Sequence, residues 1–299
     1  MVASHNSSDP QRENSELRSG TFVPRSKSFF RRSESFFPRG PARNTIRNLP
    51  PHEEEIRLVA KQEGRVRSLV DKWEKKGKTP ASVDWRKQGA LTPVRDQKYC
   101  AAQYAFAFAA MLEAQFFIRH GELPSLSVQQ LIDCLNPENA VNYGCQGGHA
   151  MSTFYYLQIA GGLQSERDYP FEGKQGACRY VLGRDVVQVN DIFGLSGEKA
   201  MRHFIHRKGP VVAYVNPALM INDYTGGVIS HDARACNPHP SHLTHMVVIV
   251  GYGQSRAGVP YWIVRNSWGP RWGYAGYAYV ERGTNACGIE QVAILAAIE

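Results

Sequence analysis

Two stretches of the chain carry apolar residues at the three- and four-residue spacing of an amphipathic helix. The first lies between residues 53 and 77, and the second lies between residues 103 and 117. Their apolar positions are Ile56, Val59, Val66, Leu69, Val70 and Trp73 in the first, and Phe106, Ala110, Ala114 and Phe117 in the second. We predict a helix at each place, the first one short and followed by a linker up to residue 79.

Beyond residue 190 the pattern changes to short runs of branched and aromatic residues, which are typical of strands. These runs are 209–215, 246–250, 261–264 and 277–280. His245 directly precedes the second run, so we expect its imidazole at the head of a buried strand.

The first 52 residues show neither pattern. They are rich in Ser, Arg, Asn and Pro, and so little apolar surface cannot offset the entropy of ordering, which predicts a disordered tail. Within it lies a repeat that places Arg25 ahead of Ser28 and Arg32 ahead of Ser35, each copy ending in two phenylalanines. The repeat resembles a basophilic kinase site and could bind an adaptor or an anionic surface. An unselected low-complexity tail is the other interpretation.

Charge follows the same division. The chain has 35 Lys and Arg against 27 Asp and Glu, and 17 of these basic and 10 of these acidic residues lie within positions 1–79. The rest of the chain is nearly neutral, so we expect no nucleic-acid partner for the domain. No run approaches the ~18 apolar residues of a membrane span. The residues predict no metal site and no cofactor.

Residues 80–299 carry the motifs of a known enzyme family, in order. The stretch 96–106 reads D-Q-K-Y-C-A-A-Q-Y-A-F, similar to the motif Q-G-x-C-G-S-C-W-A-F. Further landmarks are S-V-D-W-R at 82–86, L-S-V-Q-Q-L-I-D-C at 126–134, G-C-Q-G-G at 144–148, Y-P at 169–170, V-G-Y-G at 250–253, W-I-V-R-N-S-W-G at 262–269 and N-A-C-G-I at 285–289. The segment resembles the papain-like cysteine proteases of the cathepsin L-like type.

The resemblance implies an α+β fold of two lobes with a cleft between them. The left lobe, near 100–185, would be mostly helical, and the right lobe, near 190–299, would be rich in strands. The chain would then divide into a tail (1–52), a helix with linker (53–79) and a papain-like domain (80–299). The predicted helix at 53–77 is far shorter than the family's inhibitory propeptide.

The family motif also assigns roles within the site. His245 would be the general acid and base, Asn266 would orient its ring, and Trp268 would cover their hydrogen bond from water. Gln97 would donate its side-chain amide to the oxyanion. A polar core cluster inherited with the scaffold is the alternative interpretation of these residues.

Gln103 stands where the motif has the nucleophilic Cys. We expect it at the amino-terminal end of the helix, with its side-chain amide hydrogen-bonded to the imidazole of His245. The lone pair of a carboxamide nitrogen is delocalised, so it cannot be activated for acyl transfer. Lys98 replaces a Gly, Ala101 and Ala102 replace Gly-Ser, and Tyr104 replaces a Trp. These linked changes predict a narrowed cleft near the scissile bond and argue against an engineered knock-out.

The six cysteines leave no obvious substitute. Sequence alone allows 15 pairings, and six free thiols in a reducing compartment is a further possibility. By similarity to the family they pair as Cys100–Cys145, Cys134–Cys178 and Cys236–Cys287. An active relative of this type would need a seventh, unpaired thiol.

The groove beside the site is less altered. Gly147 and Gly148 match the stretch that pairs with an extended peptide. Ala150, Met151, Ala213 and Met220 are candidate walls of a specificity pocket, and ordinary core positions are the alternative. Peptide capture without cleavage follows as an expectation.

Three functions are compatible with these residues. The first is a non-catalytic module, a pseudoprotease, that holds a peptide or protein ligand in the cleft between the lobes. The second is a cysteine-type peptidase with an unrecognised nucleophile, and the third is a structural or matrix protein.

Localisation is contradictory at this level. Disulfides favour a secretory, lysosomal or extracellular compartment, but the first residues show no apolar signal segment. We expect a secretory or lysosomal ancestry, with an intracellular location as the alternative.

Overall fold

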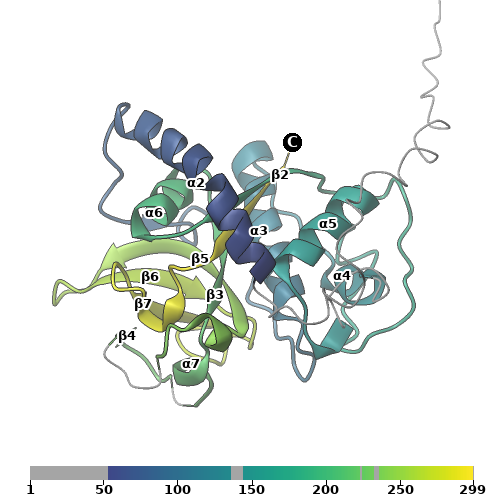
Figure 1. Ribbon diagram of the computed structural model, residues 1–299. Coiled ribbons are helices and arrows are strands. Elements are labelled where there is room, and N and C mark those ends of the chain that lie inside the picture. Colours follow the sequence, from purple (N-terminus) through teal and green to yellow (C-terminus); the bar gives the residue numbers. More distant parts are fainter. Residues whose placement is uncertain (1–52, 136–143, 223, 232–235, 299) are drawn as a thin grey trace, which may run out of the picture. The chain divides into compact units, whose positions relative to one another are not determined.

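The computed structural model describes residues 53–135, 144–222, 224–231 and 236–298. The predicted tail and its Arg-Ser repeat lie outside these ranges. In Figure 1 the helices α3, α4 and α5 gather beside a sheet formed mainly by residues beyond 185. The helices are α2 (Glu53–Glu74), α3 (Gln103–His120), α4 (Val128–Cys134), α5 (Ala150–Ala160), α6 (Glu198–Arg207) and α7 (Ala218–Asn222).

Eight strands form one sheet in the order β2-β8-β3-β5-β6-β7-β4, and β1 pairs with β5. Most pairings are antiparallel, while β4 and β7 run parallel. The strands are β1 (Val83–Asp84), β2 (Val189–Leu195), β3 (Val211–Val215), β4 (Val228–Ile229), β5 (His245–Gln254), β6 (Pro260–Arg265), β7 (Tyr277–Glu281) and β8 (Ala293–Ile298). The structure therefore has the expected α+β class.

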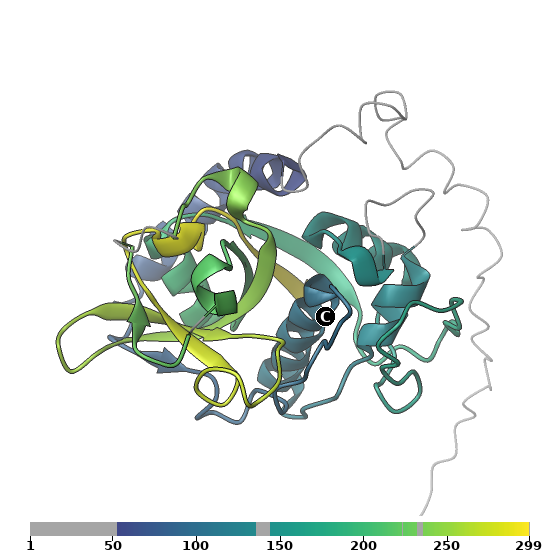
Figure 2. The same cartoon turned by 90° about the horizontal axis from the view of Figure 1, so that it is seen from below.

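Helix α3 lies between the two lobes and is buried almost throughout its first three turns. Its alanines favour helix and leave little side-chain bulk, so it packs against β3, β5 and β8 on one side and against α4 and α5 on the other (Figure 2). Gly121 ends it in the left-handed conformation, with φ of 77°, and its N–H bonds to the carbonyl of Phe117. A helix that is apolar all round thus becomes the shared core of both lobes.

Strand β3 has core on both of its faces. Val212 and Tyr214 belong to the cluster that includes α3, whereas Val211, Ala213 and Val215 belong to a second cluster on the opposite face. This alternation follows from the two-residue period of a strand. It decides which side chains of β3 can reach the site.

The segment ahead of α3 is fixed to both lobes by two arginines, of which Arg95 is half-buried and Arg265 is buried. Arg95 donates to the carbonyl of Leu126 (2.9 Å) and to Oε1 of Glu113 (2.8 Å). Arg265, on β6, donates to the carbonyl of Pro93 (2.9 Å). These bonds hold the chain that leads into the site at a set position between the lobes.

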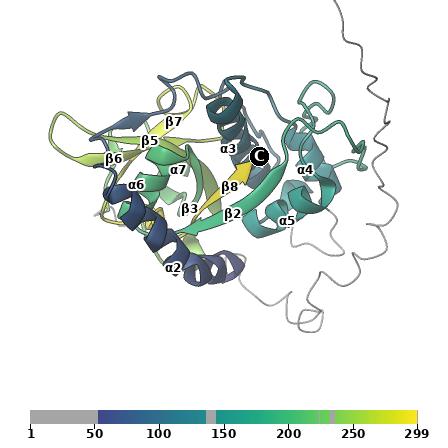
Figure 3. The ribbon, with the colours of Figure 1, turned by 90° about the horizontal axis from the view of Figure 1, so that it is seen from above.

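Helix α2 packs along the edge strand β2 and against α6 (Figure 3). Val66 and Val70 are buried, and the ring of Trp73 meets that of Phe204 edge to face at 4.9 Å. Farther toward the amino terminus, Gln62 donates to the carbonyl of Ile192 (3.0 Å) and accepts from the N–H of Gly194 (3.2 Å). The helix ends at Glu74, three residues before the end of the predicted segment.

Candidate functional site

Gln97 is held on three sides. Its N–H donates to the carbonyl of Ser267 (2.8 Å), and its Oε1 accepts from Oγ of Ser267 (2.5 Å). Its Nε2 donates to the carbonyl of Cys100 (3.0 Å), and the side chain is buried. One of the two N–H donors of this amide is therefore used within the protein, and the other makes no hydrogen bond among the described residues.

The next residue, Lys98, has a left-handed backbone with φ of 54°. Its N–H donates to Oδ1 of Asp96 (2.8 Å), which closes a tight turn. Such a conformation costs glycine little but brings Cβ close to the carbonyl of any other residue. The turn thus keeps a conformation suited to glycine although a lysine stands there.

Gln103 is the first residue of α3 and is half-buried. Its neighbours are fixed, because Ala101 donates its N–H to the carbonyl of Cys145 (2.9 Å) and Tyr104 donates its hydroxyl to the carbonyl of Gly144 (3.0 Å). Ala102 makes no side-chain cap bond to the helix. Position 103 lies at the positive amino-terminal end of α3.

His245 opens β5, as expected from the sequence. Its Nε2 lies 2.9 Å from Oδ1 of Asn266, and the ring of Trp268 lies over it with centroids 4.8 Å apart. Oδ1 of Asn266 also accepts from the N–H of Ser267 (2.8 Å). Since that oxygen is an acceptor, Nε2 of His245 carries the proton and Nδ1 presents its lone pair.

The imidazole is deeply buried, and this burial lowers its pKa from 6.5 to about 4. The hydrogen bond to Asn266 acts weakly in the opposite direction. No carboxylate or thiolate is among the causes that shift this pKa. At neutral pH the ring is uncharged.

We expected the amide of Gln103 to hydrogen-bond this imidazole. Within the described residues the only hydrogen-bond partner of the His245 ring is Asn266, so that expectation is wrong for this structure. Gln103 begins α3 and His245 begins β5, and no hydrogen bond joins the Gln103 amide to the imidazole.

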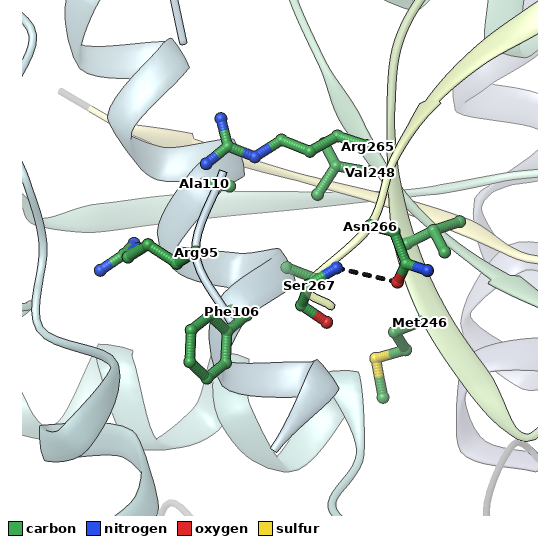
Figure 4. Close-up of a pocket in the computed structure, with 10 residues that line it drawn as sticks. Arg95, Phe106, Ala110, Met246, Val248, Arg265, Asn266 and Ser267 are labelled. Carbon is green, nitrogen blue, oxygen red and sulfur yellow. Dashed lines mark hydrogen bonds between the residues drawn. The ribbon is translucent and has the colours of Figure 1, made fainter. Parts of the chain in front are cut away.

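Behind Asn266 lies an interior cavity of about 10 Å³, close to the size of one water molecule. Figure 4 shows side chains of α3, β5 and β6 around it, together with Arg95. The Nδ2 atom of Asn266 is buried and has no hydrogen-bond partner among the described residues. The cavity is too small for a substrate.

A family model described as papain family cysteine protease matches residues 79–297. The chain belongs to this family. Pro-cathepsin H of Bos taurus is 38% identical over 216 residues, covering 71% of this chain and 63% of the relative. Cathepsin K of Mus musculus is 36% identical over 224 residues, covering 74% and 65%. The chain thus spans less than two thirds of the length of these curated relatives.

Solved structures agree. The digestive procathepsin L 3 of Tenebrio molitor larval midgut superposes with a TM-score of 0.68 at 35% identity, covering 74% of this chain and 71% of that one. Bromelain from Ananas comosus, solved with the inhibitor E64, gives 0.66 at 33% identity, covering 74% and 100%. The fold is papain-like, with the substrate cleft of that fold.

The three disulfides form with the pairing that the family resemblance implied. They are Cys100–Cys145, Cys134–Cys178 and Cys236–Cys287, with Cα atoms 4.4, 4.6 and 4.3 Å apart. The sequence contains six cysteines in all. Every cysteine of this papain-family chain is therefore bonded, and none carries a free thiol.

The expected peptide-binding residues separate into two groups. Gly147 and Gly148 are half-buried just ahead of α5, and Ala150 and Met151 form its first turn. Ala213 and Met220 instead pack in the cluster on the far face of the sheet. The structure therefore does not bring these two side chains to Ala150 and Met151; at Ala213 this follows from the strand period, because the adjacent Tyr214 faces the helices.

Sequence analysis missed Tyr214 and Glu55 at this place. The Tyr214 hydroxyl accepts from the N–H of Ala150 (3.1 Å) and donates to Oε1 of Glu55 (2.9 Å). The strand period could have identified Tyr214. No local signal in α2 distinguishes Glu55 from the two glutamates before it.

Other ligand classes receive no support from the described ranges. They contain no group of His, Cys, Asp and Glu that could hold a metal ion. Nor do they include a helix long and apolar enough to cross a membrane.

Proposed function

We propose that this papain-family chain is catalytically inactive and acts as a binding module for a peptide or protein. The observation that carries the proposal is the pairing of all six cysteines in disulfides. A cysteine protease attacks through a thiolate, and this chain has no thiol to ionise. Gln103, at the position that the motif gives to the nucleophile, supplies a non-basic amide.

The electrostatics of the site support the same proposal. In a catalytic Cys–His pair the imidazolium and the thiolate stabilise each other's charge. Here His245 is buried and its pKa is about 4, because no anion offsets the loss of water. The ring therefore acts as a neutral hydrogen-bonding group beside Asn266.

Family membership favours one competing function, a peptidase with another nucleophile. Ser267, which follows Asn266, carries a buried hydroxyl at the site. Its proton is donated to Oε1 of Gln97 at 2.5 Å, so it is directed to Gln97 and not to His245. A serine in this state lacks the contact with a base that activation needs.

A binding role uses what the site retains. Gly147 and Gly148 keep the backbone freedom with which a strand-like peptide pairs, and Gln97 keeps one free amide donor. The disulfides suit a secretory or lysosomal compartment, as the cathepsin relatives also suggest. The Arg-Ser repeat of the tail, as a site for an adaptor or an anionic surface, belongs to the same proposal.

Retention of uncut peptides tests this function. The full-length protein is incubated with a mixture of unstructured peptides, separated by gel filtration, and the bound fraction is identified by mass spectrometry. We expect peptides to co-elute intact, and Gly148→Val to lower their recovery at least about five-fold by blocking the approach of the peptide backbone. Recovery of cleavage products would contradict the proposal, and so would a failure to retain any peptide.

A further inference from the structure

Glu55, in the first turn of α2, carries a buried carboxyl group whose hydrogen-bond partners lie far away in the sequence. Its side chain is fully buried, and Oε1 accepts from the N–H of Met151 (3.0 Å) and from the hydroxyl of Tyr214 (2.9 Å). These partners belong to opposite lobes, since Met151 lies on α5 and Tyr214 on β3. A residue of the amino-terminal helix thus occupies the junction where Ala150 and Met151 were expected to line a pocket.

The donors around this carboxyl form an anion-binding arrangement. Met151 lies in the first turn of α5, an 11-residue helix whose positive end favours a negative charge. The N–H of Ala150 donates to the Tyr214 hydroxyl (3.1 Å), which leaves the tyrosine proton for the carboxylate. Chains of hydrogen bonds of this kind strengthen one another.

Only one of the two carboxyl oxygens of Glu55 is hydrogen-bonded in this pocket. Its second oxygen, Oε2, is buried and has no hydrogen-bond partner among the described residues. Burial is also the largest influence on the carboxyl and raises its pKa above 4.5. A half-satisfied buried carboxylate costs free energy, so another carboxylate with a better placed second oxygen can compete for the pocket.

The anchoring of α2 permits such competition. The bonds of Gln62 to β2 and the buried side chains of Val66 and Val70 hold the helix from its third turn onward. Glu55 belongs to the first turn, where Ile56 is 37% exposed. The end of a helix frays more easily than its middle, so the first turn can leave the pocket while the remainder stays docked.

We infer that the pocket formed by Met151 and Tyr214 is a carboxylate-binding site for an acidic side chain of a bound peptide, and that Glu55 is its internal occupant. The inference rests on the proposed binding function and assigns it a ligand class. A peptide that follows Gly147 and Gly148 leads directly to this pocket, because α5 begins two residues later. Opening of the first turn of α2 then controls access.

Emptying the pocket tests the inference. The full-length chain with Glu55→Ala is titrated with propionate, with propionamide as an uncharged molecule of the same size, and with the capped tripeptides Ala-Glu-Ala and Ala-Gln-Ala. The readout is the NMR shift of the Met151 amide. We expect propionate and the Glu tripeptide to bind at least about ten-fold more tightly than their amide counterparts. Tyr214→Phe in the same background should reduce that preference about ten-fold.

Two comparisons make the result decisive. Glu54→Ala removes the neighbouring carboxylate but leaves Glu55 in the pocket, so it should bind the Glu tripeptide at least about ten-fold more weakly than Glu55→Ala does, as judged by the shift of the Met151 amide. Where Glu55→Ala does not fold, Glu55→Gln keeps the side-chain size and should bind the Glu tripeptide more tightly than the unmodified chain does. Equal affinity for acid and amide probes would overturn the carboxylate site. Binding of propionate without the Glu tripeptide would overturn its role as a peptide site. Neither result would alter the proposed inactivity.

Discussion

At the scale of single residues, the site combines inherited positions with changed chemistry. His245, Asn266 and Trp268 lie together as the family motif implies, with the ring on Asn266 Oδ1 at 2.9 Å and beneath the indole. Gln103 begins α3, where the helix end would stabilise a thiolate. Lys98 takes the backbone conformation of a glycine. The scaffold of the site is therefore kept, whereas under our proposal the reacting group is not.

Relief of the backbone strain at Lys98 gives a first prediction. Lys98→Gly should stabilise the protein by about 1 kcal/mol, because the left-handed conformation costs a residue with a Cβ roughly that amount. Urea unfolding measures the change. Lys98→Ala is the matched control, since it removes the charge and keeps the Cβ. An equal gain in both variants would assign the effect to charge.

The protonation of His245 gives a second prediction. In NMR titration its pKa should be about 4, and His245→Gln identifies its signal among those of the 10 histidines. Gln103→Cys should raise this pKa, because a thiolate favours the imidazolium. A His245 pKa near 6.5 in the unmodified chain would contradict a buried ring that has no anion beside it.

The sign of the resulting pH dependence follows from linkage. Folded His245 binds its proton more weakly than the unfolded chain does, so stability falls as pH drops from 6.5 toward 4. Glu55 acts in the opposite direction, because its raised pKa removes stability as pH rises above 4.5. His245→Gln should remove the loss of stability below pH 6.5, and Glu55→Gln should remove the loss of stability above pH 4.5.

At the scale of elements, segments with a clear hydrophobic period could be predicted as helices or strands, whereas the way these elements pack together could not. The patterns at 103–117 and 246–250 correspond to α3 and β5. Strand β8 escaped prediction because its alanines favour helix in isolation. It becomes a strand because β2 and β3 pair with it on both sides.

The same limit applies to the site. The family motifs alone predicted that His245, Asn266 and Gln97 lie in one site, because the order of those motifs specifies the family fold. The contact of Glu55 with Met151 and Tyr214 joins residues far apart in sequence and depends on how α2 docks. The direction of the Gln103 amide depends on side-chain packing at the helix end. No local sequence pattern marks either the contacts of Glu55 or the direction of the Gln103 amide.

The packing of α2 gives a third prediction. Trp73→Ala should destabilise the protein by about 2–3 kcal/mol, below the cost of a fully buried aromatic, because Trp73 is half-buried against Phe204. Lys72→Ala, one position earlier and exposed, should change stability by less than about 0.5 kcal/mol. Equal, small effects in urea unfolding would show that α2 does not belong to the cooperative unit.

At the scale of the whole molecule, two disulfides lie within the helical lobe and one lies within the strand-rich lobe. They close loops of 45, 44 and 51 residues, so each should contribute roughly 3–4 kcal/mol by restricting the unfolded chain. Reduction should add one hydrogen mass per cysteine and lower the unfolding temperature sharply. Thiol reagents should label the denatured, unreduced protein nowhere. A labelled cysteine would remove the main support for inactivity.

The proposed inactivity is a property of several residues together. Gln103→Cys alone should give weak peptidase activity at most, because Lys98, Ala101 and Tyr104 still shape the turn and the helix start. Changing those three positions to the family's Gly, Gly and Trp as well should raise activity by at least about ten-fold. Equal activity of the single and the combined variant would show that the neighbouring changes have no catalytic effect.

Turnover of fluorogenic peptide substrates by the unmodified full-length chain tests the central claim most directly. The combined variant serves as the positive control, and His245→Ala serves as the background. The account predicts that the unmodified chain is indistinguishable from His245→Ala at every substrate tested. Robust turnover that His245→Ala abolishes would contradict it and would assign this papain-family chain a nucleophile other than cysteine.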